Sequence, residues 1–245
     1  MKKIPLFVLI SLISFSAISQ SQEKRPRNLT AFDYKRIHFG FTVGFNMMDL
    51  GFERNYEAED FIYADVSYPL AGFQVGIISD LRLNKNWNLR FMPGISFGSR
   101  EIYYYEYDPV NGPGDEVQLA GAENPVALGP GYLDFPLHFK YRSDRHNNYR
   151  PYLVGGLNFR YDMAAKKAFD SESNNYVRFK PADLYVEFGF GVDTYLKYFK
   201  FAPEIKFAIG LANIIADEGR APYPQFMNSI QRATSYIVML NFHFE

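Results

Sequence analysis

Cysteine is absent from all 245 residues, which excludes a scaffold held together by disulfide bonds. Past the first 18 residues no apolar run reaches the ~20 residues that a transmembrane helix needs. No charge excess exists either, because 26 Lys and Arg face 27 Asp and Glu, so nothing indicates nucleic-acid binding. Tryptophan occurs once, yet 24 Phe and 19 Tyr raise the aromatic content to 18%. That share is high for a soluble domain and is typical of a surface where aromatic rings meet lipid headgroups.

The chain opens with "MKKIPLFVLISLISFSAISQ", in which two lysines precede an apolar run that ends near Ile18. Small residues follow, and Ala17-Ile18-Ser19 before Gln20 has the character of a cleavage site. We therefore predict a secretory signal peptide over residues 1–19. The alternative is an N-terminal membrane anchor, for which the run is short. No cysteine lies at the cleavage point, so we expect no lipid anchor there.

The remaining chain alternates apolar and polar residues with a period of two, which is the pattern of β-strands with two different faces. Eight segments show it: HFGFTVGFN (38–46), GFQVGIISDLRLN (72–84), NLRFMPGISFGSR (88–100), YLDFPLHFKY (132–141), RPYLVGGLNFRY (150–161), DLYVEFGFGVDTYL (183–196), KFAPEIKFAIG (200–210) and TSYIVMLNFHFE (234–245). The fifth segment alternates least clearly. Most are about as long as the ~9–11 residues that a tilted strand needs to cross a bilayer.

The apolar face of these segments carries no charged residue. This absence is informative, because a lipid-facing Arg or Lys at mid-depth costs ~2–4 kcal/mol. A soluble sandwich also alternates, but its inner faces need large and small residues that interdigitate. Here the apolar faces are nearly all large, and the glycines and charges share the opposite face. That distribution favours a barrel with lipid outside and a narrow polar lumen inside.

The connections alternate between short and long. Short links lie at 84–86, at "RSDRHNN" (142–148) and at 197–198, and long ones at roughly 47–71, 107–131, 162–182 and 211–232. Short periplasmic turns and long outer loops are typical of bacterial outer-membrane barrels. We predict an all-β fold: an eight-stranded antiparallel transmembrane outer-membrane β-barrel over residues 37–245, with both ends in the periplasm and the last strand paired with the first.

Two features depart from the alternating pattern. Residues 20–36 are polar and basic, and form either a disordered lead or a periplasmic segment that makes contacts. Pro93, Pro136 and Pro203 lie inside predicted strands, where each removes a hydrogen-bond donor from the ladder. We expect bulges or local breaks at these three prolines.

The inward face carries both signs of charge. We place fourteen ionisable side chains there: His38, Asp80, Arg82, Arg90, Arg100, Asp134, His138, Lys140, Arg160, Glu187, Asp193, Glu204, Lys206 and His243. An eight-stranded barrel is just wide enough for its side chains to fill it, and buried charge must be paired. The sequence therefore predicts a plugged lumen of ion pairs. The alternative is a proton or ion path.

The histidines and serines are the candidates for a metal site or a catalytic site. His38 and His243 lie on strands that meet on closure, but His138 is predicted on the far side, so a metal site is the less favoured interpretation. Lipid-modifying barrel enzymes use a Ser and a His, yet Ser79 and Ser96 are mid-strand and no G-x-S-x-G turn occurs. His146 lies in a short periplasmic turn, away from the outer leaflet. We predict no catalytic, cofactor-binding or metal-binding residue, no enzyme activity and no small-molecule substrate.

A tyrosine-rich run, "EIYYYEYDPVNGPG" (101–114), extends the third segment beyond the bilayer. Tyr103 to Tyr105 and Tyr107 form either an aromatic girdle at the membrane interface or a patch that docks a partner.

Several of these segments resemble the PorT/SprT family of Bacteroidetes outer-membrane barrels. The resemblance rests on "HFGFTVGFN", "GFQVGIISDLRLNKNWNLRFMPGISFG", "YLDFPLHFKYRSDRHNNYRPYLVGGLNFRYD" and "FGFGVDTYLKYFKFAPEIKFAIGL". It covers the strands and short turns and is weak in the four long loops. It implies a non-enzymatic role in the type IX secretion system, which exports proteins with C-terminal signals and supports gliding in some species. Expected partners are outer-membrane lipid and other components of that system. The alternatives are a lipid-modifying barrel and a structural or adhesive barrel.

Overall fold

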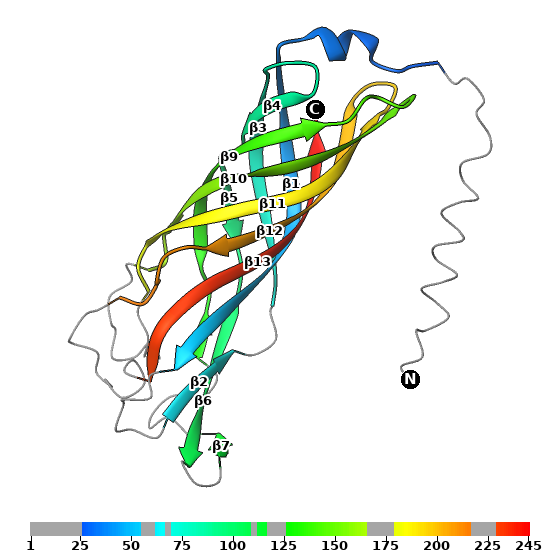
Figure 1. The fold of residues 1–245 in the computed structure, drawn as a ribbon. Coiled ribbons are helices and arrows are strands. Elements are labelled where there is room, and N and C mark those ends of the chain that lie inside the picture. Colours follow the sequence, from blue (N-terminus) through cyan, green and yellow to red (C-terminus); the bar gives the residue numbers. More distant parts are fainter. Residues whose placement is uncertain are drawn as a thin grey trace, which may run out of the picture.

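The computed structural model describes residues 26–54, 62–66, 70–108, 112–116, 126–165, 179–216 and 229–245 (Figure 1). The predicted signal peptide and residues 20–25 lie outside this range, as do large parts of the four predicted outer loops. Within it, no helix is long and apolar enough to cross a membrane.

A closed ring of antiparallel strands forms the body of the protein (Figure 1). In ring order its members are β1 (Ile37–Arg54), β3 (Ala71–Arg82), the pair β4 (Trp87–Phe91) and β5 (Gly94–Phe97), β9 (Gly131–Arg142), β10 (Tyr149–Asp162), β11 (Ala182–Tyr195), β12 (Lys200–Gly210) and β13 (Ile230–Phe244). Strands β4 and β5 both lie between β3 and β9, so together they occupy one position in the ring. The ring therefore has eight such positions, called staves here. The last strand pairs with the first, from Phe41 opposite Phe244 onward, which confirms the predicted closure.

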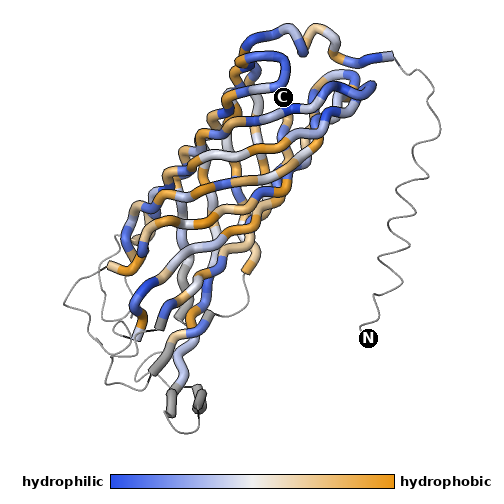
Figure 2. Tube along the Cα trace, viewed as in Figure 1, coloured by the Kyte–Doolittle hydropathy of each residue, from blue (hydrophilic) through white to orange (hydrophobic). Residues whose placement is uncertain are grey.

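The two faces of the wall are assigned as the alternation predicts. Figure 2 shows apolar and polar residues following one another along the strands. Large apolar side chains such as Phe45, Leu153 and Phe188 are exposed on the outer face, whereas Asp80, Arg90 and Glu187 are buried. A soluble fold would bury these aromatic rings, so exposure on every stave means that the wall is built to contact lipid.

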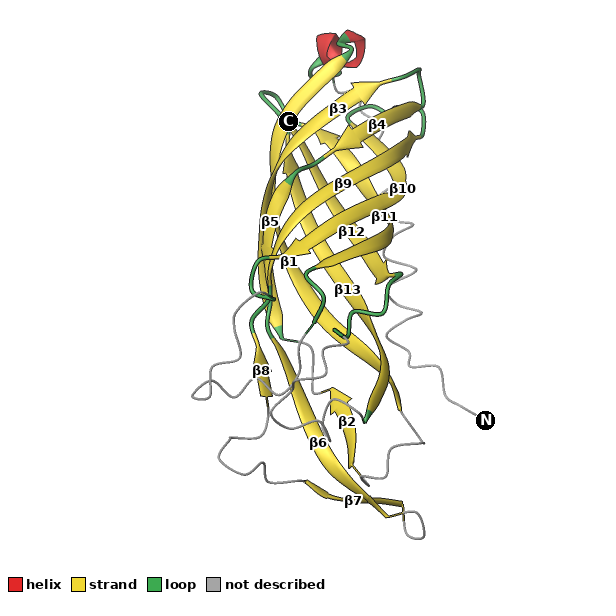
Figure 3. Ribbon diagram, turned by 90° about the vertical axis from the view of Figure 1, so that its left-hand side faces the viewer, coloured by secondary structure: helices red, strands yellow, loops and turns green. Residues whose placement is uncertain are grey.

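The two ends of the barrel differ. At one end, called here the turn end, lie the three short links 83–86, 143–148 and 196–199, the C-terminus and the short 3-10 helix η2 (Thr30–Tyr34) (Figures 1 and 3). At the other, the loop end, β2 (Ile62–Val66), β6 (Arg100–Asp108), β7 (Gly112–Glu116) and β8 (Val126–Leu128) form a small separate sheet. Strand β1 runs on to Arg54, well past the predicted start of the loop at residue 47.

The prolines disturb the ladders without changing their register. Pro93 separates β4 from β5, but Phe91 opposite Ser79 and Gly94 opposite Gly76 keep the same pairing. Pro136 continues in register with Asn158. At Pro203 the pairing between β11 and β12 is interrupted, yet it resumes in the same register. Local breaks are thus found at Pro93 and Pro203, and the expected bulges are not, since losing one donor does not insert a residue.

Glycines allow the wall to curve tightly around its narrow interior. A Cβ atom on Gly156 would overlap the carbonyl oxygen of Leu137 on the neighbouring strand, whereas one on Gly155 would meet no atom closer than 3.8 Å. The two glycines are adjacent and face opposite sides of the wall. Close approach, rather than an unusual φ angle, is the reason that Gly156 has no side chain.

We expect Gly156→Ala to lower the free energy of unfolding by about 1–3 kcal/mol, the usual cost of overpacking. Gly155→Ala is the matched control and should be neutral or stabilising by about 0.4–1 kcal/mol, because alanine restricts the unfolded chain. Equilibrium unfolding of the refolded protein in urea checks both values. Equal effects of the two substitutions would contradict the assignment of Gly156 to the crowded face.

Candidate functional site

The interior of the barrel holds a network of buried charges, and Arg90 on β4 lies at its centre. Its Nη1 atom is 3.2 Å from Glu204 Oε2 across the lumen on β12. Its Nη2 atom is 3.3 Å from Asp80 Oδ2 and 3.5 Å from Glu245 Oε1. All four side chains are fully buried. One guanidinium therefore joins carboxylates from three other staves, which suits its fixed fork of donors.

A second group lies beside it, towards the turn end. Lys140 Nζ is 2.7 Å from Asp193 Oδ1, and Lys200 Nζ is 2.7 Å from Glu245 Oε2. Lys200 also lies 3.7 Å from Asp193, so the two lysines and two carboxylates form one connected cluster. Lys140 further stacks on the ring of Tyr152, with 3.6 Å between Nζ and the ring centroid.

Glu187 on β11 is the centre of the third group. Lys206 Nζ lies 2.6 Å from its Oε2 atom, His138 Nε2 lies 2.8 Å from the same oxygen, and Arg160 Nη2 is 3.7 Å from Oε1. Asn158 donates a hydrogen bond of 2.7 Å to Oε1. Arg160 also lies 2.8 Å from Asp134. Glu187 thus pairs with charges on both neighbouring strands, Arg160 on β10 and Lys206 on β12, as a lumen plugged by ion pairs requires.

The charges inside nearly balance in the described part of the chain. The buried basic side chains are Arg90, Arg100, Lys140, Arg142, Arg150, Arg160, Lys200 and Lys206, and the buried acidic ones are Asp80, Asp134, Asp162, Asp183, Glu187, Asp193, Glu204 and Glu245. Burying an isolated charge is very costly, so such a set is stable only when it is paired. Of the fourteen predicted inward groups, Arg82 alone is not buried, because it lies at the rim of the turn end.

Six of these buried charges were not among the fourteen predicted inward groups: Arg142, Arg150, Asp162, Asp183, Lys200 and Glu245. They lie at the ends of strands, where alternation weakens and the pattern no longer tells inside from outside. The available signal was that each lies two residues from an inward position, namely Lys140, Tyr152, Arg160, Tyr185, Ala202 and His243.

Towards the loop end the interior contains a cluster of apolar and aromatic side chains. Met48, Tyr132, Tyr185, Ala208, Ile237 and Met239 form one buried cluster. Their residue positions alternate with lipid-facing ones, so they point into the barrel. The guanidinium groups of Arg100 and Arg160 lie against it, each 5.7 Å from the centroid of the Tyr132 ring. The sequence did not predict this cluster, because methionine and tyrosine are common on both faces.

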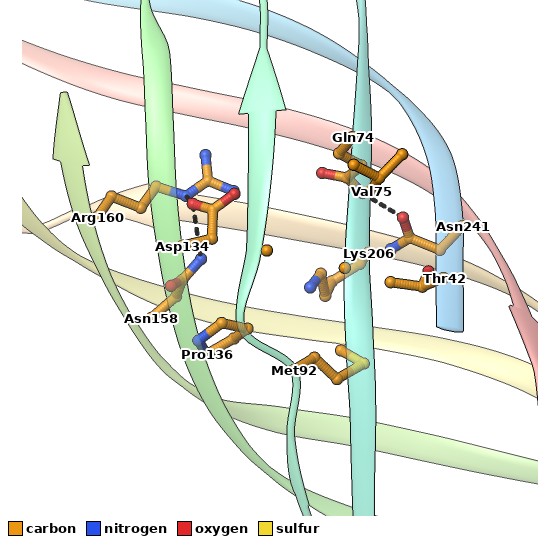
Figure 4. A pocket seen from close by; sticks show the side chains of 12 residues that line it. Thr42, Gln74, Val75, Met92, Asp134, Pro136, Asn158, Arg160, Lys206 and Asn241 are labelled. Carbon is orange, nitrogen blue, oxygen red and sulfur yellow. Dashed lines mark hydrogen bonds and ion pairs between the residues drawn. The ribbon is translucent and has the colours of Figure 1, made fainter. Parts of the chain in front are cut away.

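A small cavity remains in the middle of the lumen, of about 30 Å³. Figure 4 shows Asp134, Arg160 and Asn158 on one part of its lining and Lys206, Thr42, Gln74 and Asn241 on another. Gln74 and Asn241 are hydrogen-bonded to each other there. This volume holds about one water molecule. It is too small for a solute, which agrees with the predicted plugged lumen in this part of the barrel.

The histidines are held in separate environments. His138 contacts Glu187, His243 Nε2 lies 3.3 Å from Glu204 Oε2, and His38 stacks on Phe32 with ring centroids 3.9 Å apart. No three His, Asp or Glu side chains of the described residues are arranged as metal ligands. Ser96 is buried in the wall, Ser79 lies on the outer face, and His146 is exposed in the turn at 143–148, so these residues do not come together.

The tyrosines of the run 101–114, predicted to form an aromatic girdle or a docking patch, do not all lie on one face of β6. Tyr104 is buried, so it does not belong to an exposed girdle. Tyr103 and Tyr105 stack on the other face of β6, with ring centroids 6.4 Å apart. The side chain of Tyr107 lies outside the described residues.

Closed staves, an outward apolar belt and a filled charged interior define an outer-membrane β-barrel protein. Residues 19–216 match the family described as outer membrane protein beta-barrel domain, and the chain belongs to that family. Its location is therefore the outer membrane, with the turn end in the periplasm by the general topology of such barrels.

Two solved structures are similar in fold. The outer membrane protein OprG from Pseudomonas aeruginosa is 11% identical, with a TM-score of 0.43 over 85% of this chain and 93% of that one. Neisserial surface protein A is 12% identical, with a TM-score of 0.41 over 85% and 98%. A search of curated proteins gave no match.

Proposed function

We propose that this chain is a non-enzymatic outer-membrane component of the type IX secretion system, and that it acts through protein contacts. The resemblance of its strands and short turns to the PorT/SprT family carries this proposal. The most specific runs are "RLNKNWNLRF" and "HNNYRPY", which join a periplasmic turn to a strand.

The filled lumen is compatible with a role that does not conduct. Paired charges occupy the middle of the barrel and an apolar cluster occupies the loop end. A protein substrate therefore has no route through this barrel, and the two ends are the surfaces left for contacts. On this proposal, the chain assists a separate export channel rather than being one.

Deleting the gene should leave proteins with C-terminal secretion signals in the periplasm, because the machine would lack one of its outer-membrane parts. Proteomics of culture medium and periplasm measures this directly. A plasmid copy should restore export, which controls for effects on neighbouring genes. Normal export in the deletion strain would end the proposal.

The same strain separates the two alternatives. A lipid-modifying enzyme would change the mass spectrum of lipid A, and we expect no change. A structural or adhesive barrel would leave both secretion and lipid A intact. Loss of export with an unchanged lipid spectrum is thus the result that fits the proposal.

A further inference from the structure

Three arginines at the turn end converge on one residue of the N-terminal segment. Arg145 Nη1 lies 2.9 Å from Asp33 Oδ2, and Arg150 Nη1 lies 3.4 Å from Asp33 Oδ1. Arg82 donates a hydrogen bond to the backbone carbonyl of Asp33. The hydroxyl of Tyr195 completes the set with a bond of 3.1 Å to Asp33 Oδ1. Residues from three staves and one turn thus bind a single aspartate.

The arginines are positioned by the barrel itself. Arg150 donates to the carbonyl oxygens of Ser143, at 2.7 Å, and Lys85, at 2.8 Å. Arg145 donates to the carbonyl of Asn147 at 2.8 Å, and its guanidinium lies 3.7 Å from the centroid of the Tyr195 ring. These bonds do not involve Asp33, so the donors that meet its carboxylate are held in place before it arrives.

The barrel residues here are more buried than their ligand. The side chains of Arg145 and Arg150 are 7% and 6% exposed, against 27% for Asp33. Arg142 lies at the same end, where its backbone exchanges hydrogen bonds with Asn86. Its guanidinium is buried, and Nε and Nη2 make no hydrogen bond with the described protein. The mouth therefore has a surplus of buried cationic donors, which favours a carboxylate.

The rest of the segment fits the mouth on either side of Asp33. Phe32 stacks on His38, and Lys200 Nζ lies 4.9 Å from the centroid of its ring. Asn28 accepts from Arg145 through its carbonyl and donates its side-chain amide to the carbonyl of Tyr195 at 3.1 Å. Its backbone N–H donates to Asn148 at 2.9 Å. Of the two interpretations of residues 20–36, contact with the barrel is thus observed from Pro26 onward.

We propose that the periplasmic mouth is a carboxylate-binding site, and that residues 28–36 are its tethered ligand, a cap held by Asp33. The donors are Arg145, Arg150 and Tyr195, and Phe32 fills the space beside them. The cap fixes the point at which the N-terminal chain leaves the barrel, next to the turn at 143–148. This assignment concerns the purified barrel and does not depend on the proposed role in secretion.

The absence of cysteine makes the cap easy to test, since one introduced cysteine is labelled uniquely. Ala31 is exposed within η2, so a nitroxide on Ala31→Cys reports the mobility of the cap. In the otherwise native protein we expect a restricted electron paramagnetic resonance spectrum. Adding Asp33→Ala should release the cap and give the spectrum of a label moving on the nanosecond scale. The apparent Tm should fall by about 3 °C or more, as for the loss of a charged hydrogen-bonded contact.

Asp144→Ala is the matched control, because Asp144 is an acid at the same end that pairs with Lys85 in solvent. The side chains of Asp144 and Lys85 are 73% and 70% exposed. The hydrogen bond from Lys85 lowers the pKa of the Asp144 carboxyl, but exposed pairs contribute little to stability. The control should leave the label restricted and the Tm unchanged. The proposed cap would be contradicted if the label stayed equally restricted in Asp33→Ala. It would also be contradicted if Asp33→Ala and Asp144→Ala had equal effects on label mobility and Tm.

Chemical rescue tests the site itself. Sodium acetate supplies the missing carboxylate and should raise the Tm of Asp33→Ala more than sodium chloride at the same ionic strength. It should have no such excess effect on the native protein, whose site is filled. If acetate and chloride act alike on Asp33→Ala, the mouth is not a carboxylate-binding site.

Discussion

Replacing Phe188 with arginine is expected to prevent stable insertion of the barrel into the membrane. Phe188 is near the middle of β11, is 49% exposed on the outer wall and stacks on Phe207 of β12 at 5.5 Å between centroids. A guanidinium at that depth costs about 2–4 kcal/mol in lipid, and the stacked pair is lost as well. Because folded barrels migrate differently from unfolded ones on unheated gels, refolding into lipid vesicles followed by such a gel measures the effect.

Tyr198→Arg is the matched control for this prediction. Tyr198 lies in the turn between β11 and β12 and is 80% exposed, so an arginine there stays at the aqueous rim. Phe188→Leu keeps the apolar character and should insert normally. If Phe188→Arg folds as well as Tyr198→Arg, the outer face of β11 is not the lipid face.

The second large effect is expected from Arg90→Met inside the barrel. The substitution keeps a long side chain but removes the charge shared by Asp80, Glu204 and Glu245, all of which are fully buried. Removing one partner of a buried charge network leaves uncompensated charge, which costs about 3–5 kcal/mol. Urea unfolding of the protein in vesicles measures the loss.

Lys85→Met removes a charge from an ion pair of 2.7 Å that lies in solvent, and serves as its control. Such exposed pairs contribute about 0–1 kcal/mol, so the control should unfold almost as the native protein does. If Arg90→Met lowers the free energy of unfolding no more than Lys85→Met does, the lumen is hydrated enough to screen its charges. The prediction of a plugged lumen would then be wrong.

Much of the wall was predictable because the period of a strand is local. Whether Phe188 faces lipid and Glu187 faces the lumen follows from alternation alone, since neighbouring side chains point to opposite sides. Short links at 84–86 and 197–198 were also visible, as was the pairing of the last strand with the first. The fold class, the facing of each stave and the outer-membrane location thus follow from the order of residues.

For the lumen, the sequence predicted which ionisable side chains face inward but not which of them pair. Fourteen inward ionisable groups were placed correctly on the polar face, and thirteen are buried, but their partners were not evident. Arg90 and Glu204 are 114 residues apart, on staves that are not neighbours. Whether they meet depends on the stagger of the strands around the closed ring, which sets the height of each side chain in the lumen.

Alternation and turn spacing determined an eight-stranded wall with lipid outside and charge inside, because both are properties of single strands and single turns. Closure decided that Glu187 contacts His138, Lys206 and Arg160, and that an apolar cluster forms towards the loop end. It also decided that Asp33, in a segment with no periodicity, meets Arg145 and Arg150. The contacts of Asp33 join chain segments more than a hundred residues apart, and only the closed ring brings these segments within bonding distance.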